Sequence, residues 1–151
     1  MRLILSFAVS AVLGMQAAAA FAGAENDIKY RQSVMKTSGG HMMALGAILK
    51  GDVPHKQDIP LHLDGLVAVA TMLPHLFPAG SDKGTAKTKT KAKAEIWSNA
   101  AAFDVKVKDF QKATTALQVA AKGADPAAVG AAMGGVGKAC KGCHDKFEAK
   151  E

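Results

Sequence analysis

The sequence predicts an all-α protein built as an antiparallel four-helix bundle. Three segments repeat apolar or small residues at alternating steps of four and three, which lines one face of a helix that packs against neighbours. Turn and cap residues separate the segments, and no alternating run of β-branched residues indicates a strand. Because the chain has 151 residues, we expect one domain, and four helices with modest loops favour an antiparallel bundle.

The first and last predicted helices cover about 25–49 and 126–150. Gly51-Asp52 ends the first, and Asp125-Pro126 supplies an N-cap followed by proline at the first position of the last. In antiparallel packing, Met35 would then face Cys140 and Met42 would face Met133. The first seam comprises Ile28, Gln32, Met35, Gly39, Met42, Gly46 and Leu49, and the last comprises Val129, Met133, Val136, Cys140, Cys143 and Phe147.

The two middle helices are bounded by proline and glycine. Pro74 and Pro78-Ala79-Gly80 end the second helix, and Gly123 closes the third. The second face is the shorter and less regular. It comprises Ile59, Leu63, Leu66, Val67, Ala70 and Leu73, and the third seam comprises Ile96, Ala100, Phe103, Val107, Phe110, Thr114, Leu117 and Ala121.

Residues 1–24 are interpreted as a cleaved signal peptide. Arg2 precedes an apolar stretch, Leu3 to Gly14, and small-residue triplets such as Ala20-Phe21-Ala22 follow. The stretch is shorter than the roughly 20 apolar residues of a membrane span, so we expect no stable membrane anchor. The sequence therefore predicts a periplasmic protein with one domain over residues 25–151. Its mature chain would begin near Gly23 or Glu25.

The charge is basic, with a formal net charge of +6 that falls to +5 when Arg2 is removed with the leader. Nucleic acid is not an expected partner, because Arg31 is the only remaining arginine and no aromatic residues interleave with the lysines. Two interpretations of the lysine cluster stay open: a solvated loop with a first helical turn, or a docking patch for an acidic partner protein. The cluster comprises Lys83, Lys87, Lys89, Lys91 and Lys93.

The chemistry lies in Cys140-Lys141-Gly142-Cys143-His144, a C-x-x-C-H motif typical of covalent haem attachment. Two thiols about one helical turn apart can form thioethers with the two vinyl groups of one haem, and the adjacent histidine can bind the iron. A thioredoxin-like site would need a βαβ unit, and structural zinc would need two more ligands. A plain disulfide would leave His144 unexplained. We therefore predict one covalent haem c per chain, with Cys140, Cys143 and His144 as its residues.

A haem motif close to the C-terminus of four helices resembles the class II c-type cytochromes, the cytochrome c prime family. Ile28-Lys29-Tyr30-Arg31-Gln32 is similar to the family's first helix, and Glu95-Ile96-Trp97 to the start of its third. Gly134 to Cys140 is similar to its approach to the haem. The resemblance implies that Arg31 contacts a haem propionate and that Trp97 packs near the haem. The resemblance is also compatible with a homodimer.

Met35 decides the subtype that the resemblance implies. In cytochrome c prime the residue four after the arginine is usually a bulky non-ligand, and the iron is five-coordinate. A methionine there resembles the low-spin members of the family. We therefore expect His144 and Met35 to bind the iron of a periplasmic one-electron carrier with redox partner proteins, not an enzyme. The alternative is a five-coordinate, high-spin haem protein that binds NO or CO.

One residue departs from the resemblance. Relatives often carry a basic residue four positions after the haem histidine, whereas this chain has Glu148. A carboxylate there lies on the same helical face as His144. Two interpretations follow: Glu148 accepts the free ring N–H of His144, or it is simply exposed in the last turn.

Overall fold

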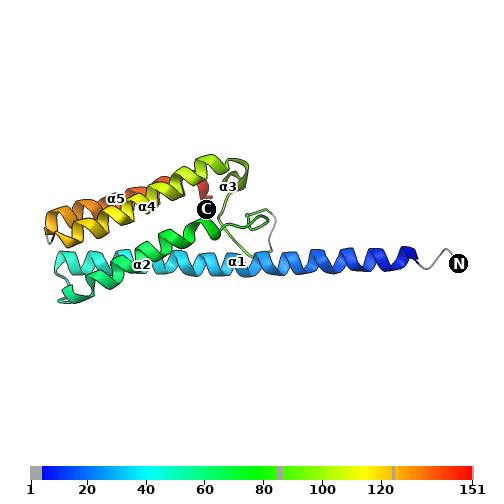
Figure 1. Ribbon diagram of the computed structural model, residues 1–151, viewed down its shortest axis with the longest axis horizontal. Helices are drawn as coiled ribbons and strands as arrows, with labels where there is room; N and C mark the ends of the chain where they lie inside the picture. The colour runs from blue at the N-terminus through cyan, green and yellow to red at the C-terminus, as the bar shows by residue number, and fades with distance from the viewer. Residues whose placement is uncertain (1–4, 85–86, 124, 151) are drawn as a thin grey trace.

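The computed structural model describes residues 5–84, 87–123 and 125–150, with side chains from residue 23 onward. Within these ranges the regular structure is helical, apart from one isolated β-bridge (Figure 1). The prediction of an all-α, antiparallel four-helix bundle is confirmed. The elements are α1 (Leu5–Lys50), α2 (Ile59–Met72), a short α3 (Glu95–Ser98), α4 (Ala100–Lys122) and α5 (Pro126–Phe147), with 3-10 turns at Lys56–Asp58 and Leu73–His75.

The bundle consists of two helix pairs. α1 packs against α2, α4 packs against α5, and contact between α2 and α4 joins the pairs. α1 and α5, by contrast, touch only sparsely. Figure 1 shows the α4–α5 pair lying over the C-terminal half of α1, with the N-terminal half of α1 extending past the other helices. Among the four contacts between neighbouring helices of the bundle, the one between the helix that carries Met35 and the helix that carries the haem motif is therefore the least close.

α1 ends where the sequence predicts and begins earlier. Gly51 adopts φ +82°, a left-handed conformation that glycine tolerates, and its N–H donates to the oxygen of Ile48 at 3.1 Å. Asp52 N–H donates to Ala47 O at 2.9 Å, which completes a Schellman motif. At the other end the helix runs through residues 5–24 of the predicted leader. Cleavage after residue 24 stays a prediction, and residues 1–4 lie outside the described ranges.

The third predicted helix is divided into α3 and α4 at Asn99. Asn99 leaves the helical conformation, with φ −128° and ψ 53°, and its side chain accepts from Ala102 N–H at 3.4 Å. Asparagine bonds to nearby backbone groups more readily than the apolar seam residues do, so it caps a new helix here. Asp125 caps α5 as predicted, accepting from Ala127 N–H at 3.0 Å with Pro126 in the first turn.

The predicted seams of α4 and α5 are buried or half-buried except at Ala100, whereas the α1 seam holds only in part. In α1, Gln32 and Gly39 are exposed, while Met35, Met42 and Leu49 are half-buried. The reason is that α1 packs mainly on α2, so its most buried face lies beside the predicted one. That buried face comprises Ile28, Arg31, Val34, Ser38, Leu45 and Ile48.

The segment that carries the lysine cluster has a fixed backbone over its described residues. Lys83 N–H donates to Ala92 O at 2.9 Å, and Lys93 N–H donates to Phe147 O at 3.0 Å. Ala92 and Glu148 form the antiparallel bridge. Lys83, Lys87, Lys89 and Lys91 are exposed and Lys93 is half-buried, all of them ahead of α3 rather than in its first turn. Docking of an acidic partner on this cluster stays a prediction.

None of the helices in the described residues combines the length and the apolar character that crossing a membrane requires.

Candidate haem site

Cys140 and Cys143 lie one turn apart on α5, and both are half-buried free thiols. Cys140 packs against the main core cluster, which includes Val34, Leu45, Leu66, Leu117 and Val136. Cys143 packs in a second cluster around Ala92, Ile96 and Phe147. The α5 seam thus turns both thiols toward apolar surroundings, as the thioether bonds of a haem require.

The electrostatics of the thiols argue against the alternative uses of a C-x-x-C pair. Burial raises the pKa of Cys140. Burial, with smaller contributions from Cys140 and Glu148 that outweigh the opposing effect of Lys106, raises the pKa of Cys143 to about 11. A thiolate is the form that exchanges disulfides or binds zinc, and these thiols resist ionisation. Nor do three or more His, Cys, Asp or Glu side chains gather as a metal site anywhere in the described ranges.

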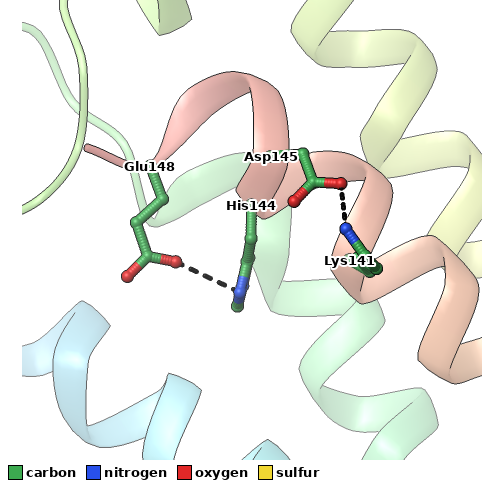
Figure 2. Close-up of polar contacts among 4 residues, drawn as sticks. All are labelled: Lys141, His144, Asp145 and Glu148. Atoms are coloured by element: carbon green, nitrogen blue, oxygen red, sulfur yellow. Dashed lines mark hydrogen bonds and ion pairs between the residues drawn. The ribbon is translucent and has the colours of Figure 1, made fainter. Parts of the chain in front are cut away.

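His144 follows Cys143 directly and projects from the last turns of α5. Its side chain is 58% exposed, and its Nδ1 lies 3.1 Å from Glu148 Oε2 (Figure 2). Of the two interpretations of Glu148, the structure therefore favours contact with the ring. With Nδ1 occupied in this way, Nε2 is the nitrogen that remains for an iron ligand.

Glycines show where room exists beside the motif. A Cβ built on Gly46 of α1 would lie 3.4 Å from the Met133 methyl group of α5, so the two helices meet there. A Cβ built on Gly39, or on Gly137 of α5, would meet nothing within 4 Å. Both glycines are exposed, so α1 and α5 make no packing contact at these two positions. Two thiols in apolar surroundings and an exposed imidazole one residue further on together fit a haem.

Met35 lies on α1, half-buried against the same core cluster that Cys140 contacts. The predicted register is approximate, because Met133 reaches Gly46, one turn beyond its predicted partner Met42. Met35 and Cys140 therefore pack against the same cluster. This position alone does not make the Met35 sulfur an iron ligand.

Arg31 is buried, at 3% exposure, and its guanidinium binds the segment that follows α2. Nη1 donates to Leu76 O at 3.2 Å and to Ser81 Oγ at 2.8 Å. Nη2 donates to Ser81 O at 2.8 Å and to Thr90 Oγ1 at 3.0 Å. Four of its five N–H groups are thus committed to protein oxygens, so a bidentate grip on a propionate would need these bonds to change. Contact with a propionate stays a prediction.

Burial also affects the pKa of the Arg31 guanidinium. It lowers the pKa of Arg31, and nearby Asp27 opposes the shift. The guanidinium carbon lies 4.7 Å from the centre of the Phe77 ring, a cation–π contact that helps a buried cation.

Trp97 lies beside the motif, as the resemblance implies. Its Nε1 donates to Phe77 O at 3.0 Å, and its indole packs in the second cluster together with Cys143. A role next to the haem is compatible with this position and stays a prediction.

Sequence reasoning did not identify the oxygens that hold Arg31, nor a histidine pair between α1 and α2. The Nδ1 atoms of His41 and His62 lie 3.0 Å apart. No local pattern indicates these contacts, because the partners are 21 to 59 residues apart. The contact of Glu148 with His144 did have a signal, the four-residue spacing within one helix.

Comparison with known proteins identifies the family. The family model described as "Cytochrome C'" matches residues 26–148. Cytochrome c′ from Pararhodospirillum photometricum is 40% identical over 126 residues, covering 83% of this chain and 98% of that protein.

Solved structures agree. The nitric oxide complex of a variant of cytochrome c prime from Alcaligenes xylosoxidans aligns with a TM-score of 0.75 at 32% identity, over 85% of this chain and 97% of that one. A carbon monoxide-bound variant of the same cytochrome also aligns with a TM-score of 0.75, at 33% identity, over 86% of this chain and 99% of that one.

These findings correct one prediction. We predicted a low-spin electron carrier whose iron binds both His144 and Met35, and that prediction is wrong. The family model and the curated relative are cytochromes c′, and the solved relatives hold nitric oxide or carbon monoxide. A methionine at the position four after Arg31 is therefore not enough to indicate the low-spin subtype.

The cofactor prediction is confirmed, since the matched family binds covalent haem c and this chain carries its C-x-x-C-H motif. The family is one of haem proteins and not, in general, of enzymes. With the family model covering most of the chain and a relative at 40% identity, the chain belongs to the cytochrome c′ family.

Proposed function

We propose that this chain is a five-coordinate, high-spin haem protein that binds a small diatomic gas such as nitric oxide or carbon monoxide. The observation that carries the proposal is the likeness in sequence and fold to solved cytochromes c prime whose structures hold these two gases. We further propose that it acts in the periplasm after loss of residues 1–24, which the charged start, apolar stretch and small-residue site support.

Three residues of α5 would hold the cofactor. Cys140 and Cys143 would form the two thioethers, and His144 would bind the iron through Nε2, because its Nδ1 faces Glu148. When bound, the haem iron supplies the position at which a gas molecule binds. The thioether bonds also remove the thiol protons, so the raised pKa of Cys143 no longer matters once attachment is complete.

The side chains of α1 and its surroundings favour a neutral ligand. Met35 and Met42 are half-buried apolar residues of α1 that pack against the main core cluster. Lys36, which follows Met35 in the sequence, is exposed, and the Arg31 guanidinium is bound to the segment after α2. An apolar surface disfavours charged ligands, which lose their hydration there, and admits uncharged diatomic molecules at little cost. In this proposal Met35 restricts access and is not an iron ligand.

The proposal is tested by carbon monoxide titration of the ferrous holoprotein. We expect the unmodified protein to bind the gas and Met35→Leu to leave the spin state unchanged. Met35→Ala should speed association, because the shorter side chain leaves the space beside α1 more open. Met42→Leu serves as the matched control and should leave binding unchanged. Binding of the gas only after Met35 is replaced would contradict the proposal.

A further inference from the structure

We infer that Glu148 is a positioning residue for the haem histidine: its carboxylate accepts the Nδ1–H of His144, holds the ring in one orientation and tautomer, and increases the electron density that the ring donates. This inference rests on the proposed role of His144 as the iron ligand. It assigns to this chain a proximal hydrogen bond between a carboxylate and a histidine.

The contact geometry is direct. Glu148 Oε2 lies 3.1 Å from His144 Nδ1, a distance suited to an N–H···O hydrogen bond. A neutral imidazole that donates from Nδ1 presents the lone pair of Nε2, the form that binds a metal. Figure 2 shows the Glu148 side chain turned toward the ring of His144.

The fold fixes the backbone from which the carboxylate extends. Glu148 is the C-cap of α5, with extended φ −106° and ψ 132°, and its N–H donates to His144 O at 3.0 Å. It also forms the bridge with Ala92, and the next residue, Ala149, donates to Lys91 O at 2.8 Å. Bonds on both sides of Glu148 therefore hold it against the segment before α3. The carboxylate is not merely a flexible group on a free helix end.

The neighbouring carboxylate provides a contrast. Asp145 adjoins His144 in sequence, but it pairs with Lys141 four residues earlier (Figure 2). Two carboxylates thus lie close to the ring, and only Glu148 bonds to it. If only negative charge near His144 mattered, Asp145 and Glu148 would influence the ring equally. A positioning role predicts that Glu148 alone influences it.

The exposure of the two side chains limits what the bond between Glu148 and His144 can contribute to folding stability. The His144 and Glu148 side chains are 58% and 41% exposed, so the pair contributes little to folding stability. Its effect would instead pass through the ring. A carboxylate partner raises the basicity of a metal-bound histidine and fixes its orientation, and loss of such partners typically changes site properties about 10- to 100-fold. A more basic histidine favours ferric over ferrous iron.

The experiment compares holoproteins carrying Glu148→Gln, Glu148→Ala and the control Asp145→Asn. The readouts are the iron–imidazole stretching frequency of the ferrous protein, by resonance Raman spectroscopy, and the midpoint potential. Glu148→Ala should lower the frequency. It should also raise the potential by about 59 mV, which is a tenfold change in the ratio of oxidised to reduced iron. Glu148→Gln keeps an acceptor oxygen and should shift both less, while Asp145→Asn should shift neither.

Two results would overturn the inference. One is an unchanged frequency and potential in both Glu148 variants, and the other is an equal shift in Asp145→Asn, which loses the same charge. Failure of the proposed function is separate, because it would appear as a six-coordinate spectrum of the unmodified protein. In that case the potentials of the Glu148 variants against Asp145→Asn still decide whether Glu148 acts on His144.

Discussion

At the scale of single residues, Arg31 connects α1 to a segment 45 to 59 residues away in the sequence. Its guanidinium fork binds backbone and side-chain oxygens from the end of α2 to the approach of α3, and it lies over the Phe77 ring. Because Phe77 also accepts from Trp97, the arginine supports the cluster that contains Cys143. Arg31 is therefore expected to act first on stability.

Replacement of Arg31 tests this role. Arg31→Ala should lower the free energy of unfolding of the holoprotein by about 3 kcal/mol, because buried oxygens lose charged donors. Arg31→Lys should recover less than half of that loss, because an ammonium group cannot reproduce the planar fork. Denaturant unfolding followed by circular dichroism measures both, and Lys29→Ala, on the exposed face of α1, is the control. Equal stability of Arg31→Ala and Lys29→Ala would contradict the structural role.

How far single residues were predictable depends on how local their partners are. Cys140, Cys143 and His144 follow from one five-residue motif whose chemistry requires that spacing. The oxygens that bind Arg31 come from loop residues that only the folded chain brings together. The four-residue spacing made contact between Glu148 and His144 one of two interpretations, and the choice between them depends on the extended backbone of Glu148.

At the scale of elements, the α1–α2 pair is joined by two histidines. His41 and His62 approach through Nδ1, and a Cβ built on Gly65 of α2 would lie 2.3 Å from His41 Nε2. The glycine therefore makes room for the ring. Burial, and to a smaller extent His62, lowers the pKa of His41.

This shift predicts a pH dependence of stability. Because the pKa of His41 is lower in the folded chain, the unfolded chain binds the proton more readily as pH falls through about 6.5. The stabilising contribution is present above that pH and is lost below it. The free energy of unfolding of the holoprotein should thus fall between about pH 7.5 and 5.5 as this contribution is lost. His41→Gln should flatten the dependence, whereas His75→Gln, at an exposed position, should not. A slope unaffected by His41→Gln would contradict the assignment.

Element boundaries were predictable where cap chemistry marks them, as at Gly51, Asp125 and the end of α2. The break at Asn99 was not, because the apolar spacing continues across it. The buried face of α1 also differed from its seam. A four-three repeat indicates that a helix packs, but the choice of face depended on the closer contact with α2 than with α5.

At the scale of the whole molecule, the haem is expected to serve as part of the interior. α1 and α5 meet near Gly46 and Met133 and leave open surface around Gly39 and Gly137. The helix pairs are joined mainly through α2 and α4. A bound cofactor between α1 and α5 would complete the contact that the side chains alone do not make.

Removal of the cofactor should therefore weaken the fold. The Cys140→Ala, Cys143→Ala double variant, produced without haem, should lose helicity and melt without a sharp transition, because a group that binds only the native state stabilises it. Circular dichroism against temperature measures both properties, with the holoprotein as the reference. A haem-free chain that melts as cooperatively as the holoprotein would show that the helices pack fully without the cofactor.

The most direct test of the proposed function is the spin state of the unmodified holoprotein, measured by electronic absorption and electron paramagnetic resonance at neutral pH. A five-coordinate haem bound only by His144 should be high-spin in both the ferric and the ferrous state, and carbon monoxide should convert the ferrous form to low spin. A protein that is low-spin in both states before any gas is added, and whose spectrum carbon monoxide leaves unchanged, would contradict the account.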